Sequence, residues 1–124
     1  MKTVAVSGGF APMHIGHIRL FKSAKIFGDC LVVILNNDKW LMDKKGYVVM
    51  PQEDRVELLL SLEVVDAVYI TRHEEGDNDR SVCKALEVIR PNIFANGGYR
   101  TVDNIPETEL CERLNIKMIF NIGG

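Results

Sequence analysis

The chain alternates short apolar runs with longer segments whose apolar residues recur every three or four positions. Short runs rich in valine and isoleucine are typical of strands buried on both faces of a parallel sheet, and the helical spacing is typical of helices that cover such a sheet. The runs predict strands at 2–6, 30–35, 64–70, 93–95 and 117–122. The spacing predicts helices at 14–27, from Pro51 onward, at 80–90 and after a capping box at 104–107.

The order of strand, helix and strand predicts right-handed crossovers and therefore an α/β fold. We expect one domain over residues 1–124, a Rossmann-like three-layer sandwich with a parallel sheet of about five strands. In such a sheet ligands bind where the strands end. Between 36 and 50 the pattern predicts no helix: Asn36-Asn37-Asp38 is expected to form a turn, and Trp40 and Lys44-Lys45-Gly46-Tyr47 are expected to lie in a loop.

Composition narrows the class of protein. Of 124 residues, 47% are hydrophobic and 26% are charged, as in an ordinary globular protein. A formal net charge of -2 argues against a nucleic-acid partner, because no basic excess is present to displace counterions from a polyphosphate backbone. Because the chain shows no signal peptide or membrane-length apolar run, and its three cysteines lack paired spacing, we expect a soluble cytoplasmic protein without a membrane partner.

The candidate chemistry lies between the first predicted strand and the first predicted helix, in Ser-Gly-Gly-Phe-Ala-Pro-Met-His-Ile-Gly-His at 7–17. Gly8 and Gly9 have no Cβ, so their backbone can approach an anion closely, and free N–H groups of the helix's first turn point at the same place. His14 and His17 stand three residues apart and share one face of that turn. Because two imidazoles there can donate hydrogen bonds to phosphate oxygens, the stretch predicts a phosphate site.

Two other interpretations of the histidines stay open: either ring can be a hydrogen-bonded structural residue, or the pair can bind a metal ion. A zinc site needs three or four ligands at suitable spacing, and Cys30, Cys83 and Cys111 are scattered without a Cys-x-x-Cys pair. We therefore predict no metal site built from protein side chains. His73 lies among acids in a polar loop at 71–79, and the sequence assigns it no role.

These residues resemble the signature of nucleotidyltransferases that share a His-x-Gly-His motif, in particular the cytidylyltransferase-like group. Gly8-Gly9-Phe10 and His14-Ile15-Gly16-His17 match it between a strand and a helix. That group includes glycerol-3-phosphate cytidylyltransferases and heptose-1-phosphate adenylyltransferases. The resemblance extends over most of the chain, through the lysines at 44–45, Pro-x-Glu-Asp-Arg at 51–55 and the glycine pair at 97–98.

The resemblance implies a role for each matching residue. His14 and His17 would stabilise charge on the α- and β-phosphate oxygens in the transition state, and Lys44, Lys45 and Arg55 would hold the triphosphate and the incoming phosphate. The implied nucleotide site comprises Gly8, Gly9, Phe10, His14, His17, Lys44, Lys45, Asn96, Gly97, Gly98, Arg100 and Thr101. Mg²⁺ would bridge the phosphates and be bound mainly through the nucleotide.

The implied reaction is nucleotidyl transfer to a small phosphorylated metabolite, with release of pyrophosphate. We expect CTP and glycerol 3-phosphate as substrates, and a homodimer, because relatives in the family are commonly dimers. Ala11 and Tyr99 stand where acidic residues are common in the family, and no Ser-Thr-Thr motif follows the last predicted strand. Two alternatives stay open: an adenylyltransferase that uses ATP and a sugar phosphate, and a nucleotide-binding protein without catalytic activity.

Overall fold

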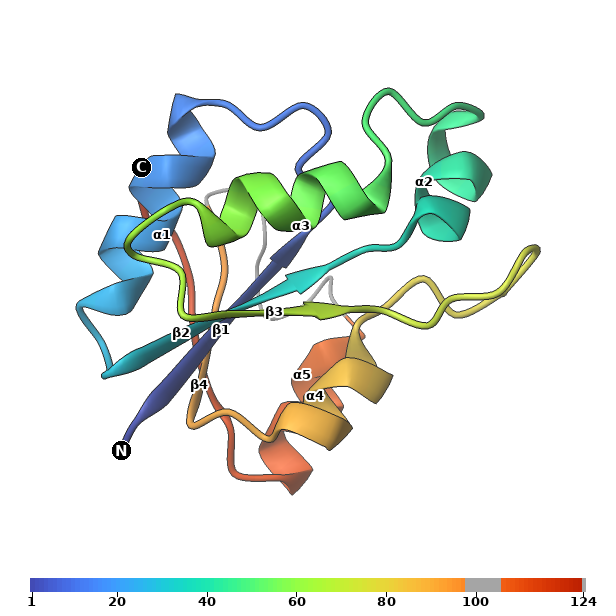
Figure 1. Cartoon of the computed structure of the whole chain (residues 1–124). Coiled ribbons are helices and arrows are strands. Elements are labelled where there is room, and N and C mark those ends of the chain that lie inside the picture. The colour runs from blue at the N-terminus through green and yellow to red at the C-terminus, as the bar shows by residue number, and fades with distance from the viewer. Residues whose placement is uncertain (98–105, 124) are drawn as a thin grey trace.

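A computed structural model describes residues 1–97 and 106–123, in which five parallel strands form one sheet between two layers of helices (Figure 1). In chain order the elements are β1 (Thr3–Gly8), α1 (Ile15–Lys25), β2 (Cys30–Leu35), α2 (Asp38–Lys45), α3 (Gln52–Leu60), β3 (Ala67–Ile70), α4 (Cys83–Ile89), β4 (Ile93–Ala95), α5 (Glu107–Arg113) and β5 (Lys117–Ile119). The strands lie in the order β3-β2-β1-β4-β5, and each neighbouring pair is parallel. The predicted Rossmann-like α/β architecture is therefore confirmed.

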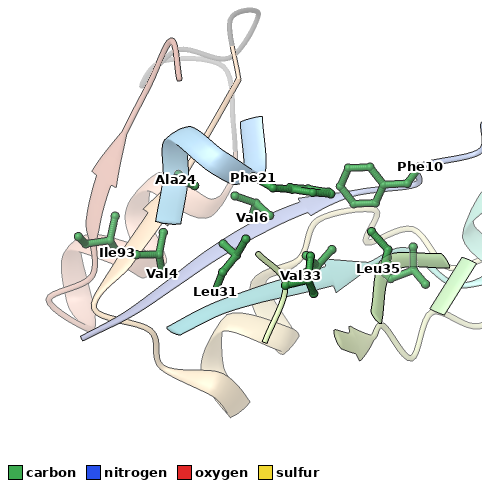
Figure 2. Close-up of a cluster of buried hydrophobic side chains, with 12 residues drawn as sticks. Val4, Val6, Phe10, Phe21, Ala24, Leu31, Val33, Leu35 and Ile93 are labelled. Atoms are coloured by element: carbon green, nitrogen blue, oxygen red, sulfur yellow. The ribbon is translucent and has the colours of Figure 1, made fainter. Parts of the chain in front are cut away.

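The sheet buries apolar side chains on both faces. Val4 and Val6 of β1 pack with Phe21 of α1 in a cluster on the face that α1 and α3 cover (Figure 2). Ala5, between them, packs with Leu86 of α4 in a second cluster on the opposite face, which α4 and α5 cover. Because successive side chains of a strand point to opposite faces, burial on both sides produces the unbroken apolar runs of the sequence.

Two predicted strands have the predicted bounds, β2 and β4. β1 extends to Gly8 rather than ending at residue 6, so this glycine of the predicted turn is the last residue of the strand. β3 begins at Ala67 rather than residue 64, β5 ends at Ile119 rather than residue 122, and the helix α4 spans seven residues of the predicted 80–90. Of the predicted capping box, Asn104 lies outside the described residues, and α5 begins at Glu107 after the N-cap Pro106, which makes no side-chain cap bond. Within the described ranges, no helix is long and apolar enough to cross a bilayer.

The prediction of a loop after β2 is wrong, because residues 38–45 form the helix α2. Asn37 caps its N-terminus, where the side-chain oxygen accepts a hydrogen bond from the Trp40 N–H at 2.9 Å. Gly46 ends the helix in the left-handed conformation, with φ at 80°. The helix therefore places Lys44 and Lys45 in its last turn, where their charges complement the helix dipole.

The strand order places the switch of direction between β1 and β4. From β1 the chain proceeds to β2 and β3 on one side, and from β4 to β5 on the other. Val4 lies opposite Ile93 and Ala5 opposite Phe94, so the turns that follow β1 and β4 begin side by side at the carboxyl edge of the sheet. A crevice at such a point is where open α/β sheets bind ligands.

Candidate functional site

His14 and His17 cap the N-terminus of α1 and bind each other's backbone. His14 is the N-cap residue; its Nδ1 accepts a hydrogen bond from the Gly16 N–H at 3.1 Å. The Nδ1 of His17 accepts from the His14 N–H, also at 3.1 Å, which completes a capping box made of two histidines. Because both Nδ1 atoms are acceptors, each neutral ring has its proton on Nε2, where it is a hydrogen-bond donor.

The two rings lie stacked at the surface rather than in the core. Their centroids are 3.9 Å apart; His14 is exposed and His17 is partly buried. The rings of Phe10 and His17 make a T-shaped contact, with centroids 4.8 Å apart. Burial, and secondly the nearby charge of His14, lower the pKa of His17. Neither Nε2 atom has a hydrogen-bond partner among the described residues, so both N–H groups can donate to an anion.

The glycines of the stretch give room to side chains that build the site. A Cβ at Gly16 would lie 2.8 Å from Cε1 of His14, so the glycine allows the imidazole to fold back over the helix end. A Cβ at Gly8 would lie 2.8 Å from the ring of Phe10, which is 5% exposed and packs against Phe21 (Figure 2). Gly8 thus makes room for Phe10, which holds His17, and this is a packing role that the sequence did not predict.

The two lysines of α2 point to different places. Nζ of Lys45 donates to the Ala11 carbonyl at 3.2 Å and so lies beside the turn that leads to the histidines. Nζ of Lys44 lies 4.7 Å from the centroid of the Trp40 ring in a cation–π contact. Both lysines are exposed. The structure places the charge of Lys45 beside the turn that follows β1 (residues 9–12, called the glycine turn below) and the charge of Lys44 next to an aromatic ring.

Arg55, predicted to hold phosphate, is buried, with 1% of its surface exposed, and its hydrogen bonds are to protein groups. Its guanidinium donates to three backbone carbonyls, those of Gly9 at 2.8 Å, Asn36 at 2.6 Å and Met50 at 3.0 Å. It also forms an ion pair with Asp38 at 2.7 Å. Since these contacts use most of its N–H groups, Arg55 positions the glycine turn against β2 and α2 rather than presenting a charge to solvent.

The second predicted turn, after β4, is only partly described. The backbone N–H of Asn96 donates to the Ile119 carbonyl at 2.8 Å, and its side-chain amide donates to the Phe94 and Ile119 carbonyls at 3.3 Å. These bonds give Asn96 the structural role of joining β4 to β5, while Gly97 lies at the carboxyl edge as predicted. The predicted site residues Gly98, Arg100 and Thr101, together with Tyr99, lie outside the described residues.

The structure gives a role to His73, which the sequence left without one. The Asn37 N–H donates to the Thr71 hydroxyl at 3.0 Å, and that hydroxyl is 2.8 Å from Nδ1 of His73. Nε2 of His73 lies 3.0 Å from the Ser81 carbonyl, which can only accept, so this nitrogen carries a proton. Both ring nitrogens are therefore bound inside the protein. No sequence pattern around a lone histidine in a polar loop indicates that it makes these contacts.

The same segment is joined to α2 at further points. The indole N–H of Trp40 donates to the Arg80 carbonyl at 2.9 Å, and the Gly76 N–H donates to a carboxylate oxygen of Asp43 at 2.9 Å. Residues 71–82 and α2 thus form one connected unit beside the glycine turn. Within the described part of the chain, no three His, Cys, Asp or Glu side chains come together as a possible metal site.

A helix start with paired imidazoles, at the switch point of a parallel sheet, is an arrangement typical of nucleotide-binding α/β domains. The sequence profile of the cytidylyltransferase-like family matches residues 5–120, so the chain belongs to that family. The resemblance to the cytidylyltransferase-like group that the sequence indicated is thereby confirmed at the level of the family.

Proteins with similar sequences include FAD synthases and bifunctional HldE proteins. The FAD synthase of Thermococcus onnurineus is 47% identical over 112 residues, which are 90% of this chain and 67% of that protein. The bifunctional protein HldE of Streptomyces coelicolor is 35% identical over 111 residues, 88% of this chain but only 23% of that protein. The chain thus spans about a quarter or less of the HldE relatives. A lipopolysaccharide core biosynthesis protein from Thermoplasma volcanium has a similar structure, with a TM-score of 0.75, 28% identity, and coverage of 97% of this chain and 95% of that one.

Proposed function

We propose that this domain transfers a nucleotidyl group from a nucleoside triphosphate to the phosphate of a small metabolite. The observation that supports it most directly is the stacked pair of imidazoles at the start of α1, whose Nε2–H groups have no partner among the described residues. A phosphate oxygen of the acceptor attacks the α-phosphorus in line, the bond from that phosphorus to the β-phosphate oxygen breaks, and pyrophosphate leaves. No general base is required, because a phosphate monoester is already ionised and nucleophilic at neutral pH.

The protein's contribution in this scheme is charge stabilisation and positioning. His14 and His17 donate from Nε2 to the phosphate oxygens on which negative charge develops, and the N-terminal end of the helix dipole favours the same charge. Lys45 exchanges its single hydrogen bond to the Ala11 carbonyl for an ionic contact with the triphosphate. Mg²⁺ would arrive on the triphosphate, because the described residues offer no three-ligand site of their own.

Among nucleotides we favour ATP over the CTP that the sequence predicted. FAD is flavin mononucleotide (FMN) joined to an adenylyl group, so the relative with 47% identity is named for a product that carries adenylate. We therefore put FMN first among acceptors, a sugar phosphate second and the predicted pair of CTP with glycerol 3-phosphate third. A homodimer remains part of the proposal from the family resemblance, and light scattering in solution measures it.

Pyrophosphate release tests the proposal. The purified protein with Mg²⁺ receives ATP or CTP together with FMN, a sugar 1-phosphate or glycerol 3-phosphate, and each mixture is compared with one that lacks the acceptor. We expect release that depends on the acceptor, and more of it with ATP than with CTP. Nucleotide binding without turnover across the whole panel would instead support the non-catalytic alternative.

A further inference from the structure

At or just beyond the carboxyl ends of four neighbouring strands, polar side chains lie on the face of the sheet that α4 and α5 cover. In spatial order these residues are Asn96, Ser7, Asn36 and Thr71. Their face follows from the alternation of side chains along each strand, because Phe94, Ala5 and Ile34 precede the first three by two residues and belong to the apolar cluster under α4 and α5. The histidines, by contrast, begin the helix that covers the opposite face.

The outer two members of this row have partners and the inner two do not. The Asn96 amide donates to carbonyls, and the Thr71 hydroxyl bonds to Asn37 and His73. Neither Ser7 nor Asn36 makes a side-chain hydrogen bond to any described residue. Asn36 is only 4% exposed and its Oδ1 is buried without a partner.

A buried carboxamide without hydrogen bonds is rare, since leaving such a group unpaired costs free energy in the folded protein. Asn36 is also held where it is. Its N–H donates to the Gly8 carbonyl at 3.0 Å and its carbonyl accepts from Arg55 at 2.6 Å. The backbone therefore cannot move to find the side chain a partner within the protein, and the amide stays directly beside the glycine turn.

We propose that Asn36, together with Ser7, binds hydroxyl groups that the acceptor carries near its phosphate, such as those on the ribityl chain of FMN or on a polyol or sugar phosphate. Ser7 lies opposite Ile34 in the β1–β2 ladder, so Asn36 is its diagonal neighbour two residues further along. A hydroxyl group can donate to the amide oxygen and accept from the amide nitrogen, and so suits both atoms of the carboxamide. This inference rests on the proposed nucleotidyl transfer.

The position of Asn36 in the sheet favours a contact with the acceptor rather than with the nucleotide. Asn36 lies on the β2 side of the glycine turn, towards β3 and the α2 helix with Lys45. The turn at Asn96-Gly97, predicted to border the nucleoside, lies on the other side of β1. An acceptor that enters from the β2 side brings its phosphate to His14 and His17 at the start of α1. The rest of the molecule then lies next to Asn36 and Ser7.

The test replaces Asn36 with a side chain of similar size and no hydrogen-bonding groups, Asn36→Leu. We expect KM for FMN and for glycerol 3-phosphate to rise about 10-fold or more, KM for ATP to stay within about 2-fold, and Tm in the absence of substrate to stay equal or increase. The matched control is Asn92→Ala at the opposite edge of the sheet, where Oδ1 of Asn92 accepts from the Thr3 N–H at 2.8 Å. This variant should lower Tm and leave both KM values unchanged.

The outcomes separate this inference from the proposed function. Normal KM values for both acceptors in Asn36→Leu, or a rise confined to ATP, would overturn the role of Asn36 while nucleotidyl transfer stands. If the wild type shows no turnover, the proposed function fails, and the shift in Tm on adding FMN or glycerol 3-phosphate decides the binding role by itself. A shift in the wild type that Asn36→Leu abolishes supports it, and equal shifts, or none in the wild type, refute it.

Discussion

The three histidines occupy two regions that use the same side chain in opposite ways. At the start of α1, His14 and His17 accept backbone hydrogen bonds at Nδ1 and leave Nε2 unbound among the described residues. In the segment 71–82, His73 has both ring nitrogens within hydrogen-bond distance of protein oxygens. A ring with a free N–H can act on a ligand, whereas a ring bound at both nitrogens can only hold parts of the protein together.

The largest effect that this comparison predicts is on turnover. His17→Ala removes one of the two donors to the phosphates and should reduce turnover about 100- to 1000-fold, the usual cost of losing one preorganised donor. The rate of pyrophosphate release measures the loss, and circular dichroism checks that the fold persists. Turnover close to that of the wild type would contradict the proposed mechanism.

His73→Ala is the matched control for the second region. It removes two hydrogen bonds that fasten residues 71–82, so the free energy of unfolding in urea should fall by about 1–3 kcal/mol. Turnover should change much less than in His17→Ala. Equal losses of turnover in the two variants would remove the distinction between the regions.

A variant with a smaller expected effect tests whether the position of the His14 ring matters as well as its identity. Gly16→Ala puts a methyl group 2.8 Å from Cε1 of His14 and should displace that ring from its capping position. Loss of the cap costs about 1 kcal/mol, and alanine gains a similar amount over glycine in a helix, so stability should change little. Turnover should fall about 10- to 100-fold through misplacement of the donor.

The smallest effect concerns the pH dependence of stability. Because the pKa of His17 is lowered in the folded state, the unfolded chain binds its proton more readily. Stability from the neutral ring is therefore complete above the unfolded pKa of about 6.5 and is lost as pH falls towards the folded pKa. Urea unfolding between about pH 5 and pH 8 should show part of this acid loss in the wild type and not in His17→Gln. Identical slopes would show that His17 is not responsible.

Much of the fold could be read from the sequence because burial on both faces of a sheet leaves a clear pattern. The bounds of β2 and β4 follow directly from their apolar runs. α2 escaped prediction because Leu41 is its only buried residue, so it lacks an apolar face. Its ends did have signals, with Asn37 as the cap and Gly46 as the stop, but the sequence interpretation took these residues as parts of a turn and a loop.

The candidate site was predictable only in part. The His-x-Gly-His spacing identified the two rings because three residues of separation on a helix determine their shared face. The burial of Arg55 had no such signal, since its partners are backbone carbonyls that no residue pattern marks. The same holds for Asn36. Whether its buried side-chain amide has a hydrogen-bond partner depends on which residues the neighbouring strands place beside it, and no residue pattern indicates this.

Arg55 has a consequence for the timing of binding. Its guanidinium holds backbone or side-chain atoms of three segments, at Gly9, at Asn36 and Asp38, and at Met50, the first of them 46 residues away in the sequence. These segments keep a fixed arrangement and can shift only together. A substrate that approaches them meets a finished surface, so the speed of its capture would depend on diffusion and electrostatic attraction, with no slow rearrangement to wait for.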